Sequence, residues 1–483
     1  MASFHVEHFG CRAARADGEA VAEQLRAAGL CVQQPREADV VIVNTCSVTA
    51  EADRAARAFI RRAHRHNPTA RIVVTGCYAQ RAPQELAAMA GVAAVVGNSH
   101  KALAPQIVLR LQGVIPTTSA TGFVSLESLL SSGIPASQAA IWADDRFAHS
   151  FLQEAQLTPG AQTRPNLKIQ EGCGNRCSFC VIPQTRGSSR SLPGVAILKQ
   201  VRGFVAAGGQ ELVLSGINLG RWGRDLRPNP ADGKAVALAG LVREVLSETP
   251  LPRLRLSSIE PMDWDAELLA VLAEFAGPRV VAPRLARHAH LPLQSGSDSV
   301  LRRMFRRYRP WHYVQKVEAL LAAAGPDLTL GADVMAGFPG ESEAEFEETL
   351  ALIRALPFGY LHLFPFSPRP GTAAWALHRD LPVPPRVVEE RMSQLRALAA
   401  EKSRAHRLRF VGRELEAITL HTPADLTARG RSAALTENFL PVELEASCTA
   451  NQMLRVRVHG LTDEGALRAR VAEDQYGVAA ISD

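Results

Sequence analysis

The sequence predicts an α/β protein of 483 residues with a parallel α/β domain first, a central set of β/α units, and a small C-terminal β-barrel. Three observations support this fold class. Apolar strand-like runs alternate with helical patterns near the N-terminus, the alternation resumes after a polar stretch, and the last part holds only short strand-like runs separated by turns. A chain of this length is too long for one hydrophobic core.

Composition indicates an ordinary globular protein, with 47% hydrophobic and 21% charged residues. No run of about 18 apolar residues is present, and the first ten residues lack a basic region followed by an apolar stretch. We therefore expect a cytoplasmic protein with no membrane partner. The net charge of +6 weakly favours a polyanionic partner such as RNA.

Three cysteines follow the three strand-like runs of the first domain, predicted over residues 1–105. Cys11, Cys46 and Cys77 come directly after these runs, which are SFHVEHFG, ADVVIVNT and RIVVTG. In an open parallel sheet, ligands gather outside the carboxyl ends of the strands, so these cysteines can meet at one point as three metal ligands. The alternative is that they are three small buried residues, since free cysteine packs well.

Residues 106–163 are rich in Ser, Ala, Thr and Gly, and we interpret them as a connector with one helix around FAHSFLQEA. Residues 164–395 alternate strands and helices again, which predicts a full or partial barrel with its active site at the carboxyl ends of the strands. Its expected strands are NLKIQEG, ELVLSG, RLRLSS, HAHL, TLGADVMAGF and YLHLFPF.

The loop after the first of these strands carries the sequence CGNRCSFC, with Cys173, Cys177 and Cys180. Three thiolates at this spacing suit three corners of a cubane iron-sulfur cluster and leave one iron open, and Phe179 supplies apolar cover. A structural zinc site normally needs a fourth ligand, and no compact second pair is nearby. Zinc and unligated thiols remain as alternatives. Two further cysteines, Cys31 and Cys448, have no comparable partners and are interpreted as structural.

The C-terminal part, residues 408–483, contains five short strand-like runs: RELEAITL, RSAALTE, PVELEA, MLRVRVHG and ALRARVAE. Five such strands predict a small barrel of the kind used on single-stranded or looped RNA. Arg429, Arg431, Arg455 and Arg457 can contact phosphates, although a solvated barrel face is an equal alternative.

Taken with these motifs, the Cys-x-x-x-Cys-x-aromatic-Cys loop resembles the signature of the radical S-adenosylmethionine enzymes. The order of the three parts resembles the methylthiotransferases over nearly the whole chain. The matching segments are FGCRA (9–13), VNTCSVT (43–49), TGCYAQ (75–80), KIQEGCGNRCSFCVIPQTRG (168–187), LSGINLGRWG (214–223), RLSSIEP (255–261), HLPLQSGSD (290–298) and DVMAGFPGE (333–341). Two departures are Gly174 and the GGQE sequence at 208–211.

The resemblance implies a Rossmann-like or flavodoxin-like first domain, a partial radical S-adenosylmethionine barrel, and a C-terminal barrel of TRAM type. It implies that Cys173, Cys177 and Cys180 hold the catalytic [4Fe-4S] cluster whose open iron binds S-adenosylmethionine, which is cleaved to a 5′-deoxyadenosyl radical. It also implies that a second set, Cys11, Cys46 and Cys77, holds an auxiliary [4Fe-4S] cluster that presents sulfur.

Three segments, VNTCSVTAEADRAAR, TGCYAQ and SGINLGRWG, favour the subgroup that acts on N6-threonylcarbamoyladenosine. The implied reaction converts this nucleoside, at position 37 next to the tRNA anticodon, to its 2-methylthio form. The implied partners are the tRNA anticodon stem-loop, a flavodoxin-type or ferredoxin-type electron donor, and a sulfur donor. Alternatives are methylthiolation of isopentenyladenosine in tRNA or of a ribosomal protein aspartate, and a non-catalytic iron-sulfur protein that binds RNA or carries electrons.

Contacts to S-adenosylmethionine are predicted from two places. Gly208 and Gly209 precede the strand ELVLSG and can let the backbone approach the methionine amino group, although a turn that ends a helix is an equal alternative. Ser258 and Glu260 follow a strand and can bind ribose hydroxyls, with a strand-end polar pair as the alternative.

A basic cluster follows in the same domain, over residues 302–309. Its arginines are expected on a helix, where positions 302, 306 and 309 share one face and positions 303 and 307 another. The arginine cluster can contact RNA, and the alternative is a basic helix surface that faces only solvent.

Overall fold

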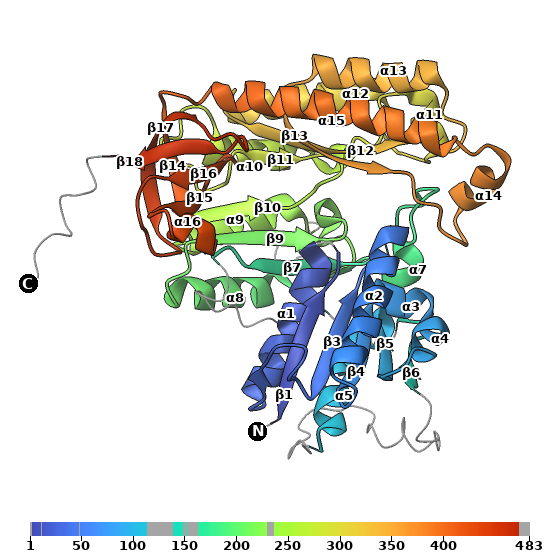
Figure 1. The fold of residues 1–483 in the computed structure, drawn as a ribbon. Coiled ribbons are helices and arrows are strands. Elements are labelled where there is room, and N and C mark those ends of the chain that lie inside the picture. Colours follow the sequence, from blue (N-terminus) through green and yellow to red (C-terminus); the bar gives the residue numbers. More distant parts are fainter. Residues whose placement is uncertain are drawn as a thin grey trace, which may run out of the picture. The chain divides into compact units, whose positions relative to one another are not determined.

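The computed structural model describes residues 2–10, 12–47, 49–113, 139–147, 152, 163–228 and 236–472. The chain divides into two compact units, shown together in Figure 1 and described here one at a time. The first unit contains residues 1–155, 171–176 and 180–189, and the second contains residues 156–170, 177–179 and 190–483. Most of the helix predicted around FAHSFLQEA lies outside the described residues, as does Cys11.

The described part of the first unit is built on a six-stranded sheet in the order β2-β1-β3-β4-β5-β6. The strand pairs among its described residues are all parallel, so the predicted flavodoxin-like sheet is confirmed. The chain runs from β1 outward to β2 and then crosses to β3 on the other side, which makes a topological switch point between β1 and β3. The strands are β1 (Ser3–His8), β2 (Cys31–Val32), β3 (Val40–Thr45), β4 (Arg71–Gly76), β5 (Val92–Gly97) and β6 (Ala140–Trp142).

Helices cover both faces of this sheet, which explains why β3 is a continuous apolar run rather than an alternating one. One face packs against α1 (Arg12–Ala27) and α5 (Ala104–Leu111), with the turn η1 (Asn98–Leu103) leading into α5. The other face packs against α2 (Ala50–His66), α3 (Cys77–Arg81) and α4 (Pro83–Ala87). Most of α5 and all of β6 fall in the stretch predicted as a connector, so the first unit includes part of residues 106–163.

The strands of the second unit form an open, partial barrel, as predicted, in the orders β10-β9-β7-β8 and β11-β12-β13. An isolated parallel bridge between Leu254 and Leu285 links β10 to the chain before β11. The strands are β7 (Asn166–Glu171), β8 (Arg190–Ser191), β9 (Glu211–Gly216), β10 (Arg253–Leu256), β11 (His288–His290), β12 (Thr329–Ala336) and β13 (Phe358–Pro365).

Local sequence signals set the helices between these strands. Ser342 and Glu345 form a capping box at the start of α13, each bonding to the other's backbone N–H. The helices are α8 (Gly194–Ala206), α9 (Leu238–Glu248), α10 (Ala266–Ala276), α11 (Asp298–Arg303), α12 (Pro310–Ala324), α13 (Glu343–Ala355), α14 (Ala373–Asp380) and α15 (Pro385–Leu408), with the turns η2 (Leu219–Arg221) and η3 (Pro261–Asp263). None of the helices in the described residues has the length and apolar character needed to cross a membrane.

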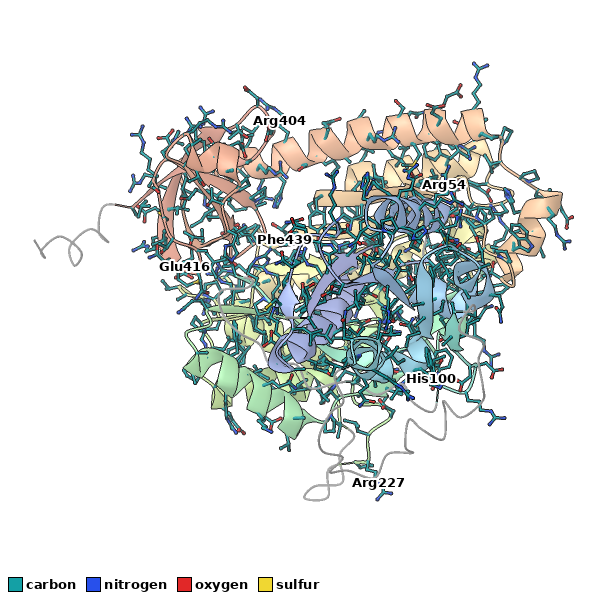
Figure 2. The ribbon with its side chains drawn as sticks, turned by 60° about the horizontal axis from the view of Figure 1, so that its bottom comes forward. Arg54, His100, Arg227, Arg404, Glu416 and Phe439 are labelled. Carbon is teal, nitrogen blue, oxygen red and sulfur yellow. The ribbon has the colours of Figure 1, made fainter. Side chains whose placement is uncertain are left out.

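The C-terminal strands close into a small barrel in the order β14-β15-β16-β18-β17, which confirms all five predicted strands. They are β14 (Glu414–Thr419), β15 (Ser432–Thr436), β16 (Pro441–Leu444), β17 (Met453–Leu461) and β18 (Leu467–Val471), with the short helix α16 (Ala424–Thr427) before β15. This barrel belongs to the second unit. Its residues Glu416 and Phe439, labelled in Figure 2, contact core strand β10: Glu416 accepts a 3.0 Å bond from Arg253, and the Phe439 ring lies under Arg255.

A buried histidine makes the stability of the second unit depend on pH. His406 of α15 is only 4% exposed and bonds to Thr329 of β12 at 2.9 Å. Burial, with help from Arg409 and Arg407, lowers the pKa of His406 to about 4. As pH falls, His406 therefore becomes protonated in the unfolded chain before it does so in the folded protein. The contribution of neutral, buried His406 to stability is complete above about pH 6.5 and is lost as pH falls through about 4.

Replacing His406 by glutamine is expected to remove this pH dependence. Between pH 7 and pH 5 the wild type should lose on the order of 2 kcal/mol from this group, and His406→Gln should not. The measurement is the free energy of urea unfolding at the two pH values. His459→Gln, on the C-terminal barrel, is the control and should keep the wild-type difference; equal pH sensitivity in His406→Gln would contradict the assignment.

Candidate functional site

Two of the predicted cysteines lie at the carboxyl edge of the first sheet, at the ends of the neighbouring strands β3 and β4. Cys46 follows β3 and Cys77 opens α3 after β4, and both are buried. Gly10, after β1, has φ +107°, and a Cβ there would lie 2.2 Å from the Cβ of Cys46 and 2.5 Å from its Sγ. The backbone at Gly10 therefore runs directly against Cys46.

Cys77 accepts hydrogen bonds from two buried donors. Asn98 Nδ2 lies 3.4 Å from its Sγ, and Arg186 Nε lies 3.3 Å from it. Metal-bound cysteine sulfurs commonly accept N–H donors from the residues around them. This donor set fits a metal-bound cysteine better than an inert core cysteine.

Arg186 is fully buried in the first unit and holds two carboxylates. Its Nη1 lies 2.7 Å from Glu171 Oε1 and 3.2 Å from Asp17 Oδ2, and Lys101 also pairs with Asp17. Arg186 ends the short helix α7 (Ile182–Arg186), which follows Cys180. One side chain thus ties the segment after the CGNRCSFC motif to Cys77 of the sheet.

The loop that carries Cys173 closes on itself through backbone contacts. The Cys173 N–H donates to Gly187 O at 3.1 Å, and the Asn175 N–H donates to Cys173 Sγ at 3.4 Å. Gly172 has φ +72°, and a Cβ there would lie 2.0 Å from Ser188 O, so only glycine fits. The loop follows β7 at its carboxyl end, where the barrel prediction placed it.

In the second unit, Arg306 connects Cys177 with Glu260. Its Nη1 lies 3.3 Å from Cys177 Sγ, its Nη2 lies 2.6 Å from Glu260 Oε2, and its Nε donates to the Tyr308 hydroxyl at 3.1 Å. Burial alone would lower the pKa of Arg306, but Tyr308, Glu260 and Cys177 together raise it well above its usual value. The guanidinium stays charged beside the Cys177 thiol.

This role of Arg306 was missed from the sequence, which placed it on a helical basic face. The helix α11 ends at Arg303, so residues 306–309 do not continue that face and the predicted pattern is wrong there. Arg303 pairs with Glu345, and Arg302 and Arg309 both pair with Asp298. No signal for this role was present in the sequence, because Arg306 stands among four other arginines in the run RRMFRRYR and only its tertiary partners distinguish it.

The two predicted contacts to S-adenosylmethionine fall in different places. Ser258 and Glu260 follow the carboxyl end of β10, on the same edge as the end of β7. Gly208 and Gly209 lie at the opposite edge, before β9, where their N–H groups bond to Val205 O and Phe204 O and end α8. This is a Schellman turn with Gly208 at φ +88°, so the structure places the glycine pair outside the candidate site.

The carboxyl end of β9 instead carries Gly216 and Asn218. The Asn218 N–H donates to Gln170 Oε1 of β7 at 2.7 Å, and a Cβ on Gly216 would meet the Gln170 side chain at 2.9 Å. The strand-end rule already applied to the cysteines would have selected these residues. The segment SGIN was noted in the sequence only for its resemblance.

Two family models match this chain. One, described as "Uncharacterized protein family UPF0004", covers residues 3–97, and the other, the radical SAM superfamily, covers residues 167–353. Among solved structures, the radical S-adenosylmethionine methyltransferase TsrM from Kitasatospora setae is similar in fold, with a TM-score of 0.54 over 78% of this chain and 77% of that chain, at 15% identity.

Curated relatives match nearly the whole chain. The "Threonylcarbamoyladenosine tRNA methylthiotransferase MtaB" of Aquifex aeolicus is 32% identical over 94% of this chain and 99% of its own. The protein of the same name from Bacillus subtilis is 33% identical over 92% and 90%. The "tRNA-2-methylthio-N(6)-dimethylallyladenosine synthase" of Erythrobacter litoralis is 34% identical over 87% of both chains.

A tricysteine loop at the carboxyl end of the first strand of a partial β/α barrel defines this protein as a radical S-adenosylmethionine enzyme. Cys46 and Cys77, which follow neighbouring strands of the parallel sheet, and the relatives that match nearly the whole chain identify the family within this class. The chain belongs to the methylthiotransferase family. Enzymes of this class use S-adenosylmethionine and two [4Fe-4S] clusters, and the described thiols fit such ligation because Cys77, Cys173 and Cys177 each accept N–H donors.

A single methyl group at Gly10 is expected to disrupt the first cysteine set selectively. Gly10→Ala places a Cβ against Cys46, so we expect loss of about half of the bound iron while cleavage of S-adenosylmethionine continues. Iron and sulfide counts after anaerobic reconstitution measure this. Gly29→Ala is the matched control, because Gly29 has φ +86° but nothing within 4 Å of the added Cβ. Full iron in Gly10→Ala would show that the Gly10 backbone does not shape the Cys46 site.

Proposed function

We propose that this protein converts N6-threonylcarbamoyladenosine, at position 37 next to the tRNA anticodon, to its 2-methylthio derivative. The observation that carries the proposal is the match to relatives named for that reaction over 92% to 94% of this chain, in a protein with both cysteine sets. The relatives named for dimethylallyladenosine match 85% to 87%. By the same resemblance, Cys11, Cys46 and Cys77 hold the auxiliary cluster and Cys173, Cys177 and Cys180 the catalytic one.

Buried, positively charged side chains donate hydrogen bonds to two of the cysteine sulfurs. Arg306 places a buried positive charge on Cys177, and Arg186 does the same for Cys77 with Asn98 as a second donor. Glu260 is held toward Cys177 by its bond to Arg306, in a position to accept hydrogen bonds from ribose hydroxyls. When bound, the clusters and S-adenosylmethionine supply the radical and sulfur chemistry that an unactivated adenine C–H bond requires.

The C-terminal barrel is the proposed contact for the tRNA stem-loop. Its four predicted phosphate ligands are partly or largely exposed, and each is paired with a carboxylate: Arg429 with Asp425, Arg431 with Glu443, and Arg455 and Arg457 with Glu414. Exposed ion pairs contribute little to stability, so phosphates can replace the carboxylates beside Arg429, Arg455 and Arg457 at little cost. We further propose that the protein works in the cytoplasm with a flavodoxin-type or ferredoxin-type electron donor and a separate sulfur donor.

The direct test is mass spectrometry of tRNA nucleosides from a deletion strain carrying either the wild-type gene or Cys77→Ala. The wild type should restore 2-methylthio-N6-threonylcarbamoyladenosine, and Cys77→Ala should leave the unmethylthiolated nucleoside. Restoration of 2-methylthio-isopentenyladenosine instead would overturn the substrate assignment. The proposed reaction would be overturned if the strains carrying the wild-type gene and Cys77→Ala, with both proteins present at the same level, had the same tRNA nucleosides and the same ribosomal protein.

A further inference from the structure

Three polar side chains meet on one face of the second unit's three-stranded sheet. They are His290 of β11, Asp333 of β12 and His362 of β13. The strand register explains the meeting, because Asp333 is paired directly with His362, and His290 is paired with Gly331, two residues before Asp333 on the same face. Three neighbouring parallel strands thus contribute one side chain each.

The spacing of these groups matches that of ligands around one metal ion. His290 Nε2 lies 3.2 Å from Asp333 Oδ2, and His362 Nδ1 lies 3.4 Å from the other oxygen, Oδ1. Taken with one atom from each residue, the three ligand atoms lie within 4.8 Å of one another. Ligands bound at about 2.0 to 2.2 Å in tetrahedral or octahedral geometry are roughly 3.0 to 3.5 Å apart. The two His-to-Asp distances fall in that interval.

A second layer of hydrogen bonds fixes the orientation of His290. Its Nδ1 lies 3.0 Å from the Tyr360 hydroxyl, which also lies 2.8 Å from His288 Nε2. The partner on Nδ1 leaves Nε2 to face Asp333. Metal-binding histidines typically have their other ring nitrogen held in this way, which fixes the tautomer and the ring direction.

Burial and charge are also suitable for a cation. The Asp333 carboxylate lies between the two imidazoles and contacts one with each of its oxygens. His290 is buried, whereas the His362 side chain is 59% exposed, which gives an ion a route from solvent.

We propose that His290, Asp333 and His362 bind one divalent first-row transition metal ion, distinct from the iron held by the cysteines. Two imidazoles and one carboxylate leave further coordination positions open for water or for an oxygen of a bound molecule. This proposal does not depend on the proposed tRNA reaction, because it is argued only from the positions of the three side chains.

Zinc binding to the cluster-reconstituted protein tests the proposal. After equilibrium dialysis against Zn²⁺, the wild type should hold one more zinc per chain than Asp333→Asn and His362→Gln, as measured by elemental analysis. The cysteines are intact in all of these proteins, so any zinc that they bind cancels in the comparison. His459→Gln is the matched control, because His459 contacts Glu445 at 3.4 Å on the C-terminal barrel and belongs to no three-ligand group in the described residues.

Equal amounts of bound zinc per chain in the wild type and both site variants would overturn the proposal. The three side chains would then be interpreted as two His–Asp ion pairs. His362→Gln keeps the test valid if Asp333→Asn fails to fold, since His362 is largely exposed. X-ray absorption of the additional zinc provides a second criterion. Nitrogen and oxygen neighbours at about 2.0 to 2.2 Å support the site, whereas a sulfur shell at about 2.3 Å overturns it.

Discussion

Replacing Cys177 by alanine is expected to lower the formation of 5′-deoxyadenosine from S-adenosylmethionine by at least about three orders of magnitude. Two thiolates cannot hold a cluster that needs three protein ligands, and the variant also leaves the buried Arg306 without its sulfur partner. The measurement is chromatographic detection of 5′-deoxyadenosine after anaerobic reconstitution and chemical reduction.

Two further variants separate the roles of the cysteines. Cys448→Ala removes a half-buried thiol of the C-terminal part and should cleave S-adenosylmethionine at the wild-type rate. Cys46→Ala should also form 5′-deoxyadenosine but should yield no methylthiolated nucleoside. Wild-type amounts of 5′-deoxyadenosine from Cys177→Ala would remove Cys177 from the catalytic site.

Replacing Arg186 by methionine should destabilise the first unit by about 3 to 5 kcal/mol, because Glu171 and Asp17 would remain buried without this cation. Methionine retains most of the apolar volume, so the loss reports the charge and not a cavity. Urea unfolding followed by circular dichroism measures the change, and reconstituted iron should fall as well, since Cys77 loses a donor.

The matched control for this variant is Arg15→Met on helix α1. Arg15 pairs with Glu19 in the same unit, but its side chain is 61% exposed, so its removal should cost at most about 1 kcal/mol. A similar loss in the free energy of unfolding for Arg15→Met and Arg186→Met would show that the buried pairs of Arg186 with Glu171 and Asp17 do not stabilise the first unit as argued.

Much of the architecture could be predicted because the strands carry strong local signals. The run VVIVNT, buried on both faces, and the short runs of the C-terminal barrel were found at nearly the observed positions. The positions of Cys46 and Cys77 at neighbouring strand ends followed from topology alone. The short strand β6 was missed, because three residues inside a polar stretch leave no readable period.

Features that depend on tertiary partners could not be predicted. The pair Gly208 and Gly209 fits a helix-ending turn and a cofactor loop equally well in sequence, and only the observed bonds to α8 decide. Arg306 looks like one member of a basic run until its partners Cys177 and Glu260 are known. The cluster around Asp333 depends on the register of three strands, although a lone carboxylate within the apolar run TLGADVMAGF was a usable signal.

The contacts of Arg186 determine where this protein can be cut for domain exchange. Residues 171–176 and 180–189 are packed as part of the first unit, although they stand in sequence within the central domain. A chimera that exchanges only residues 1–155 with a relative would match Asp17 and Cys77 of one parent with Arg186 of the other. A functional recombinant therefore has to inherit the segment around Arg186 together with the sheet, as a discontinuous module.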